Sequence, residues 1–255
     1  MGIGNAIGSN IVNVTLALGA AALVRPLRVH SRLLIRELPM LVGIMVVAWI
    51  FLSDDSLSRV EGIILLVGMI VLVIWIGVQG RQENQDADPL TAALDGEIPE
   101  PVPALKAVLW FTAGLVVLLV GSRVLVWGAI GIARGVGVSE LVIGLTLVAL
   151  GTSLPELAAS IAAARRDEQD IAVGNVVGSN MFNMLGVLGL PGVIAPDAVV
   201  DHALVTRDFP IMVGVTVLLI ATALVKKHNH IGQRTGFVLV SLFVVYFVML
   251  FIQPS

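Results

Sequence analysis

Eight apolar stretches of membrane-spanning length constrain the fold of this chain more than any other feature. A transmembrane helix needs about 20 predominantly apolar residues, with a range of about 17–25. Such stretches recur along all 255 residues: Asn5–Val24, Glu37–Leu52, Glu61–Gly80, Leu105–Ala129, Val138–Ala164, Ile171–Ile194, Phe209–Val225 and Gly236–Ile252. The second is short and contains Pro39, so we expect it to be thin, kinked or partly interfacial. The pattern predicts an all-α polytopic membrane protein.

The composition agrees with a lipid environment. Apolar residues make up 57% of the chain and charged residues only 13%, against roughly 45–50% and about 25% in soluble domains. A net charge of −3 and the lack of a long basic run argue against nucleic acid as a partner. The absence of cysteine excludes disulfides, Fe–S clusters and thiol catalysis. The partner that remains on these grounds is the lipid bilayer.

A polar segment, 81–104, separates three spans from five. It contains six acidic residues and four prolines, which is typical of a flexible linker, and it is too short for a folded domain. Weak calcium binding by its acidic residues is a less favoured interpretation. We therefore expect three parts: residues 1–80, the linker 81–104 and residues 105–255.

The basic residues of the loops predict the orientation of the chain, because Lys and Arg accumulate on the cytoplasmic side of a membrane. If the eight spans alternate, one side receives only Arg59, Arg134 and Arg207. The other receives eleven: Arg25, Arg28, Arg32, Arg36, Arg81, Lys106, Arg165, Arg166, Lys226, Lys227 and Arg234. The basic side and the linker are therefore predicted to be cytoplasmic, and both ends of this chain to point outward.

An internal repeat joins two of the spans. Residues Gly4–Pro26 read GNAIGSNIVNVTLALGAAALVRP, and Gly174–Pro196 read GNVVGSNMFNMLGVLGLPGVIAP, with no gap between the two frames. Six polar or small residues recur as the pairs Gly4/Gly174, Asn5/Asn175, Gly8/Gly178, Ser9/Ser179, Asn10/Asn180 and Asn13/Asn183. Polar residues are costly inside a membrane, so matched polar positions in two spans indicate a shared purpose.

Helical geometry suggests what that purpose is. Ser9 and Asn13, like Ser179 and Asn183, are four residues apart and lie on one helical face. The glycines one turn earlier allow a neighbouring backbone to come close. Each copy therefore presents hydroxyl and amide oxygens beside a closely packed helix. The alternative is that glycines and amides serve only helix packing, and two copies in one frame make this the weaker interpretation.

A carboxylate lies in the fifth span, in the segment Ala149–Glu156. Pro155 has no backbone N–H and disfavours helix at Leu154, so we expect the helix to break near Thr152–Leu154 and to free carbonyls around Ala149 and Leu150. A charged residue at the bilayer centre costs about 2.5–3.5 kcal/mol on insertion scales, which makes Glu156 a candidate functional residue. The alternative is an acid that reaches the interface from the end of its span.

The available ligand atoms are oxygens, from a carboxylate, hydroxyls, amides and carbonyls. This set suits hard cations such as Ca²⁺ and Na⁺. The four histidines (His30, His202, His228 and His230) all fall in predicted loops, and there is no thiolate. The residues therefore argue against a zinc or copper site.

These motifs resemble the alpha-repeats of the sodium/calcium exchanger (cation/calcium antiporter) superfamily, in particular its bacterial members. GTSLPE at Gly151–Glu156 and GNVVGSNMFN at Gly174–Asn183 are similar to the second alpha-repeat, and GNAIGSNIVN at Gly4–Asn13 is similar to the latter half of the first. Span order, linker and orientation also fit, so the resemblance covers essentially the whole chain.

The resemblance implies an inverted-repeat antiporter fold with ten spans in two five-helix halves, of which eight are expected here. It also implies secondary antiport of Ca²⁺ against Na⁺ or H⁺ by alternating access in a bacterial inner membrane. Inorganic cations are then transported partners, and no resident cofactor is expected. The implied ligands are the Ala149 carbonyl, Thr152, Ser153, Glu156, Ser179, Asn183, Ser9 and Asn13.

Two departures from the family pattern bear on function. The chain starts three residues before Gly4, without the first two transmembrane helices of the first alpha-repeat and their second Gly-Thr-Ser-x-Pro-Glu motif, which suggests a truncated sequence. Glu156 alone cannot neutralise a divalent ion in low dielectric, so we expect inefficient Ca²⁺ exchange by the chain as written. Some members have aspartate where this chain has Asn183, which leaves Na⁺ and H⁺ both open as coupling ions.

Two other function classes deserve comparison. An intramembrane hydrolase could use Ser153 or Ser179, but a serine nucleophile needs a His or Asp base nearby, and no predicted span contains histidine. A non-transporting or degenerate membrane scaffold is the other alternative, and it gains weight only if the start at Met1 is genuine.

Overall fold

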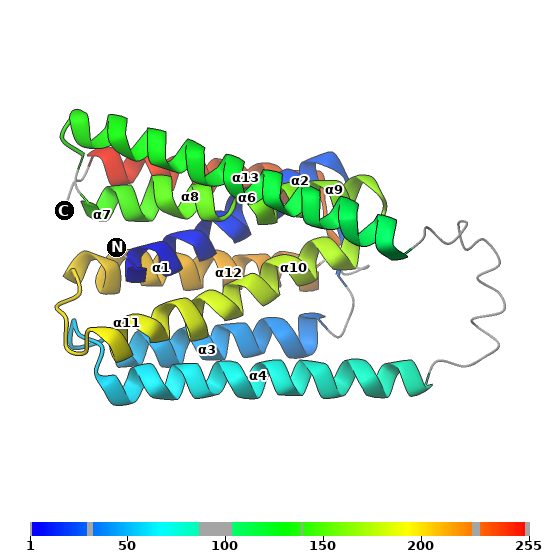
Figure 1. The fold of residues 1–255 in the computed structure, drawn as a ribbon, viewed down its shortest axis with the longest axis horizontal. Coiled ribbons are helices and arrows are strands. Elements are labelled where there is room, and N and C mark those ends of the chain that lie inside the picture. The colour runs from blue at the N-terminus through cyan, green and yellow to red at the C-terminus, as the bar shows by residue number, and fades with distance from the viewer. Residues whose placement is uncertain (1, 30–32, 87–103, 139, 226–229, 253–255) are drawn as a thin grey trace.

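The helices of this protein lie along one common axis and form a single bundle (Figure 1). The structure, a computed structural model, describes residues 2–29, 33–86, 104–138, 140–225 and 230–252. In these ranges seven helices are long and apolar enough to cross a membrane, or eight when the bent pair Gly144–Thr152 and Leu154–Arg165 counts as one span. The prediction of an all-α membrane protein with eight spans is confirmed.

The α-helices of the described ranges carry the spans. They are α1 (Gly2–Val12), α2 (Leu18–Val24), α3 (Leu38–Phe51), α4 (Arg59–Asp86), α6 (Ala104–Gly135), α7 (Glu140–Ile143), α8 (Ala149–Thr152), α9 (Leu154–Arg165), α10 (Gln169–Phe182), α11 (Leu188–Ile194), α12 (Phe209–Val225) and α13 (Gln233–Ile252).

Wider π-helical turns join several of these helices into continuous spans. They are η1 (Asn13–Ala17), η2 (Leu33–Glu37), η3 (Gly144–Val148), η4 (Asn183–Val187) and η5 (Leu204–Asp208). Two short antiparallel strands, β1 (Leu27–Arg28) and β2 (His230–Ile231), pair at one end of the bundle. Single π turns inside α-helices occur frequently at functional sites, which makes η1, η3 and η4 of interest.

The second span is longer than the sequence suggested. It covers Leu33–Phe51, a length of 19 residues, which corresponds to about 28 Å at 1.5 Å per residue and approaches the bilayer core of about 30 Å. Pro39 lies in the first turn of α3, directly after the π turn η2, so the proline stands inside one continuous helix. The expectation of a thin span is therefore wrong, and the alternatives of a kinked or partly interfacial span stay predictions.

The sequence repeat is also a structural repeat. In the first copy the turn η1 begins at Asn13 and is followed by α2. In the second copy η4 begins at Asn183 and is followed by α11, and every bound of these elements lies 170 residues after its counterpart. Figure 1 shows that α1 and α2 run in the opposite direction to α10 and α11. The two copies are therefore inverted relative to each other, as the resemblance implied.

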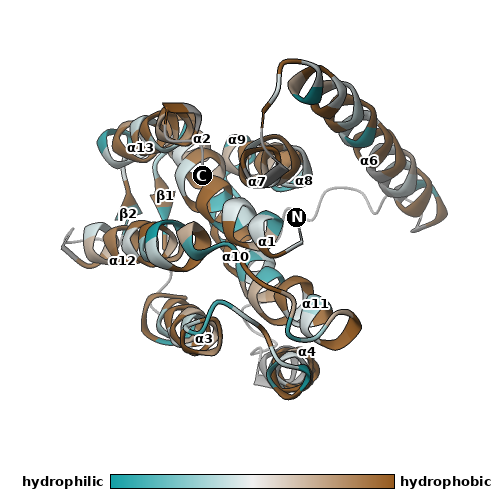
Figure 2. Cartoon of the chain, turned by 90° about the vertical axis from the view of Figure 1, so that its left-hand side faces the viewer, coloured by the Kyte–Doolittle hydropathy of each residue, from teal (hydrophilic) through white to brown (hydrophobic). Residues whose placement is uncertain are grey.

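The span Gly2–Val24 forms the interior of the bundle, and α4 and α6 lie at its edge. The buried share of the most apolar stretch is 78% for the span Gly2–Val24, 11% for the span in α4 and zero for the span in α6. Viewed along the bundle, α1 lies near the centre and α6 at the periphery (Figure 2). Large apolar side chains such as Ile70 and Trp127 are exposed on the outer helices, as expected for surfaces that face lipid.

Contacts between loops lie at both ends of the bundle. At one end Arg25 forms an ion pair with Asp167 (3.1 Å) near the β1–β2 pair. At the other end the backbone N–H of Val200 donates to the Asp55 carbonyl (2.7 Å), and the Asp55 carboxylate contacts the His202 ring (2.8 Å). The ends therefore join residues from before and after the predicted linker.

The predicted linker coincides in part with helix. Helix α4 continues to Asp86, beyond the start of the segment 81–104, and α6 begins at Ala104. Residues 87–103 lie outside the described residues, as do His30, Arg32, Lys226, Lys227 and His228. The division into 1–80, 81–104 and 105–255 stays a prediction.

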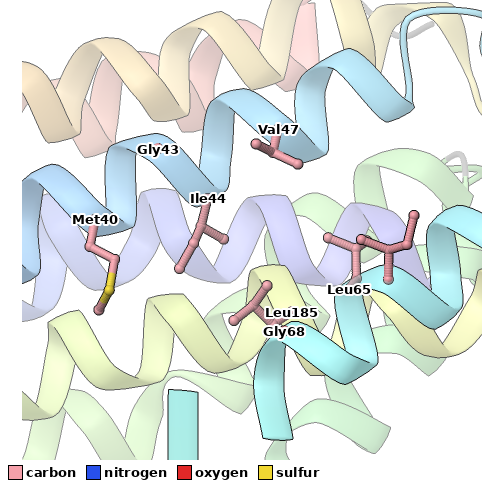
Figure 3. Close-up of a pocket in the computed structure, with 8 residues that line it drawn as sticks. Met40, Gly43, Ile44, Val47, Leu65, Gly68 and Leu185 are labelled. Atoms are coloured by element: carbon pink, nitrogen blue, oxygen red, sulfur yellow. The ribbon is translucent and has the colours of Figure 1, made fainter. Parts of the chain in front are cut away.

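An apolar groove of about 440 Å³ separates α3 from α4 (Figure 3). It is lined by Met40, Gly43, Ile44, Val47, Ile64, Leu65, Gly68 and Leu185. Its glycines leave space because they have no side chain. No polar side chain of the described residues lines this groove, so its lining does not suit a cation.

Candidate functional site

The fifth span breaks where the sequence predicted. Helix α8 ends at Thr152, α9 begins at Leu154, and the two segments meet at an angle of 46°. Pro155 cannot donate to the Gly151 carbonyl four residues earlier, and that carbonyl accepts the Ser122 hydroxyl instead. The carbonyls of Ala149 and Leu150 both accept the Ser153 N–H, so the expected freeing of carbonyls around these residues holds for Gly151 but is wrong for Ala149 and Leu150.

Hydroxyl groups gather at this break. The Ser9 hydroxyl lies 2.9 Å from that of Thr152 and also donates to the Ala149 carbonyl (3.4 Å). The Ser153 hydroxyl donates to the Ser9 carbonyl (3.5 Å), and the amide oxygen of Asn5 accepts from Thr152 (3.1 Å). Four predicted site residues from opposite parts of the chain, Ser9, Ala149, Thr152 and Ser153, are thus in mutual contact.

Gly8 explains how Ser9 comes so close to the broken helix. A Cβ atom on Gly8 would lie 2.7 Å from the Leu145 carbonyl oxygen and 2.9 Å from Cβ of Ala149. Only glycine fits at such a separation of backbones, as the small-residue motif predicted.

Glu156 lies in the first turn of α9, close to the partly positive start of a helix. Its Oε1 accepts a hydrogen bond from the Ser179 hydroxyl (2.8 Å), and its backbone carbonyl accepts from Asn175 (3.5 Å). Its Oε2 is buried and has no hydrogen-bond partner in the structure. No Lys or Arg of the described ranges forms an ion pair with it. A buried carboxylate oxygen without a partner is costly, and a bound cation would remove that cost.

Four asparagines join the two repeat copies at their middle. Asn13 is the central residue of the span Gly2–Val24, and Asn180 and Asn183 flank the centre of Gln169–Ile194. The Asn13 amide donates to Oδ1 of Asn180 (2.9 Å), and the Asn183 amide donates to Oδ1 of Asn10 (3.0 Å). The Oδ1 atom of Asn13 is buried without a partner, like Oε2 of Glu156.

Sequence reasoning named eight site residues, and each lies in one of these three groups. It did not count the recurring residues Asn5, Asn10, Asn175 and Asn180 among the site residues, although they form hydrogen bonds within these groups. Their recurrence in both copies was the signal that could have found them. Ser122, which lies outside the repeat, had no such signal.

The serines of the hydrolase alternative have other partners. Ser153 donates to a backbone carbonyl and Ser179 donates to the Glu156 carboxylate. Neither is within hydrogen-bond reach of a histidine among the described residues. The geometry therefore offers no Ser–His pair for nucleophilic catalysis.

Comparisons with known proteins agree with this geometry. Residues 1–78 and 106–252 match the family described as Sodium/calcium exchanger protein. The chain is 42% identical over 250 residues to CaxA of Alkalimonas amylolytica, whose name describes an antiporter, covering 98% of this chain and 78% of CaxA. It is 41% identical to the inner membrane protein YrbG of Escherichia coli (strain K12), covering 98% and 77% of the two chains.

A solved structure shares the fold. The sodium-calcium exchanger NCX_Mj, soaked with Na⁺ and Sr²⁺, superimposes with a TM-score of 0.74 at 31% sequence identity. The similarity covers 97% of this chain and 76% of that one.

Proposed function

The chain belongs to the sodium/calcium exchanger protein family, and from this premise we propose that it is a secondary antiporter that exchanges Ca²⁺ for Na⁺ or H⁺. It is an integral multi-pass membrane protein of a cation exchanger family. The observation that carries the proposal is the pair of buried, unpaired acceptors, Oε2 of Glu156 and Oδ1 of Asn13. Asn13 lies at the centre of the span Gly2–Val24, and Glu156 lies in the first turn of α9, which packs against η1.

The proposed ligand set is made of oxygens. Ca²⁺ takes 6–8 oxygen ligands at about 2.3–2.6 Å, and hydroxyl, amide, carbonyl and carboxylate oxygens are all present. The proposed ligands are Glu156, Thr152, Ser153, the Ala149 carbonyl, Ser179, Asn183, Ser9 and Asn13. Na⁺ is also a hard cation that prefers oxygen, so the two ions would compete for Glu156, as exchange requires.

The proposed orientation places the basic end of the bundle in the cytoplasm. Successive spans run in alternate directions along the bundle, and the loops around Arg25 and Arg166 share one end (Figure 1). Loops rich in Arg and Lys stay on the cytoplasmic side. In a bacterium this corresponds to an inner-membrane protein.

A flux assay tests the proposal. The protein, purified as its own gene expresses it, would be reconstituted in Na⁺-loaded liposomes and tested for ⁴⁵Ca²⁺ uptake. Glu156→Gln should lower uptake about 100-fold or more, since removing one partner of a buried charge pair costs about 3–5 kcal/mol. The control is Glu168→Gln, at an exposed acid just before α10, which should transport like the wild type.

The possible outcomes separate the functions. Wild-type rates in Glu156→Gln would remove Glu156 from the site. A wild-type protein that neither binds nor transports Ca²⁺ or Na⁺ would favour the membrane scaffold instead.

A further inference from the structure

We propose that Asn10 and Asn180 are positioning residues that orient the amides of Asn13 and Asn183, so that each presents its oxygen to the cation and not its N–H group. The inference rests on the proposed function, because it assumes that Asn13 and Asn183 are ligands. It assigns a separate task to two residues that bind no cation themselves.

The orientation of Asn13 follows from a backbone group. Nδ2 of Asn180 lies 3.5 Å from the carbonyl oxygen of Asn10, and a carbonyl can only accept a hydrogen bond. Asn180 must therefore turn its Oδ1 the other way, toward Asn13. That oxygen also only accepts, so Asn13 must offer its Nδ2, at 2.9 Å. As a result Oδ1 of Asn13 is left buried and unpaired.

The second copy repeats the same logic in reverse. Nδ2 of Asn10 donates to the carbonyl of Asn180 (3.3 Å), which directs Oδ1 of Asn10 toward Asn183. Nδ2 of Asn183 donates to Oδ1 of Asn10 (3.0 Å), so Oδ1 of Asn183 is the acceptor that this hydrogen bond leaves over. Each hydrogen bond of one copy recurs in the other when every residue is replaced by its counterpart 170 positions away. The cluster therefore has the twofold relation of the inverted repeat. Turning any one amide would place oxygen against oxygen or N–H against N–H.

Burial gives this arrangement its strength. Asn10, Asn13 and Asn180 are fully buried, so water cannot satisfy an amide that turns. A turned Asn13 would direct a partly positive N–H group toward the cation. Partners that orient a metal ligand typically contribute about 10–100-fold to metal affinity. The same four asparagines would also hold α1 to α10 if their role were only structural, so the test must separate orientation from packing.

The test uses the symmetry of a carboxylate. Aspartate offers oxygen in both orientations and needs no partner to present one. Asn180→Leu, which keeps the branch at Cγ and the number of side-chain heavy atoms but forms no hydrogen bond, should weaken Ca²⁺ binding about 10–100-fold. Adding Asn13→Asp to Asn180→Leu should restore most of that affinity. Equilibrium ⁴⁵Ca²⁺ binding to the purified protein in detergent measures both variants.

The second asparagine pair supplies the matched control. Asn183→Asp should rescue Asn10→Leu, and Asn13→Asp should not. Conversely, Asn183→Asp should not rescue Asn180→Leu. If the added negative charge acted only by attracting cations, each aspartate would rescue both leucine variants equally, and that result would overturn the proposal.

A further variant keeps the proposal testable if the leucine variants do not fold. Asn180→Asp retains an acceptor for Asn13 but sets its second carboxylate oxygen against the Asn10 carbonyl, so it should bind Ca²⁺ more tightly than Asn180→Ala, which offers Asn13 no acceptor. Binding by folded Asn180→Asp that is no tighter than binding by Asn180→Ala would contradict the proposal. The proposed function fails differently, namely if the wild-type protein binds neither Ca²⁺ nor Na⁺.

Discussion

The two repeat copies share a sequence but lie in different surroundings. In the first copy Gly8 packs against the backbone of Leu145, whereas no other described helix comes within 4 Å of a Cβ placed on Gly178. Ser9 contacts neutral hydroxyls and a carbonyl, whereas Ser179 contacts the Glu156 carboxylate. Identical residues therefore have unequal energetic roles, because the helix opposite each copy differs.

Other features are the same in both copies. Gly19 packs against Gly236 and its counterpart Gly189 packs against Gly62, in each case on the helix of an outer span. The π turns begin at Asn13 and Asn183, and the asparagine cluster joins the copies reciprocally. The repeat therefore determines the helix geometry and the contact between the copies, and the partner helices determine the rest.

The largest expected difference between the copies concerns their serines. Ser179→Ala removes a hydrogen bond to a charged carboxylate, which is typically worth about 1.5–3 kcal/mol, so Ca²⁺ affinity should fall about 10–100-fold. Ser9→Ala removes neutral hydrogen bonds, worth about 0.5–1.5 kcal/mol, and should lower affinity about tenfold at most. Calcium titrations of both variants check this. Equal losses would mean that the surroundings of the two serines do not matter.

Much of this comparison was visible in the sequence. The number of spans and the break at Pro155 follow from apolar patterning and proline chemistry, and the grouping of Ser9 with Thr152 was implied only by the resemblance to the exchanger family. The roles of Asn10 and Asn180 did not follow. Helical periodicity places a residue on a face of its own helix, but it does not say which helix lies opposite that face. The reciprocal bonds across 170 residues exist only once α1 and α10 cross.

A second difference concerns stability. A methyl group at Gly8 would collide with backbone atoms of Leu145, which cannot move aside as a flexible side chain can. Gly8→Ala should therefore destabilise the protein by about 1–3 kcal/mol. Gly178→Ala meets no described atom and replaces glycine in a helix, so it should be neutral or slightly stabilising. Thermal unfolding midpoints in detergent compare the two variants. A loss at Gly178 as large as at Gly8 would show that another helix or subunit covers it.

Substitutions at equivalent glycines of the two copies should lower the free energy of unfolding equally where the two glycines have the same neighbours. A Cβ on Gly19 would lie 3.2 Å from the Gly236 carbonyl oxygen, and one on Gly189 would lie 3.1 Å from that of Gly62. Gly19→Ala and Gly189→Ala should each cost about 1 kcal/mol, the lower end of the range for overpacking. The same unfolding assay applies. Clearly different losses would show that the twofold relation does not extend to the outer helices.

The π turns were not predictable, because an extra residue in one helical turn leaves no mark in the apolar pattern. Threonine is a tempting explanation for them. Thr15, Thr146 and Thr206 are each the third residue of a π turn, and the hydroxyl of each donates to the carbonyl four residues earlier. Such bonds compete with the regular helix ladder and can bend it.

The second repeat copy argues against a causal role for threonine, and a conservative variant tests this. The counterpart of Thr15 is Leu185, which has no hydroxyl, yet η4 forms at the same place as η1. The π geometry of η4 therefore does not depend on a threonine hydroxyl. Thr15→Val keeps the shape and removes only the hydroxyl, so it should cost less than about 1 kcal/mol and leave Ca²⁺ affinity within about threefold of the wild type. If Thr15→Val instead lowered Ca²⁺ affinity as strongly as Asn180→Leu, the turn in the first copy would depend on its threonine, and the two copies would reach the same geometry by different means.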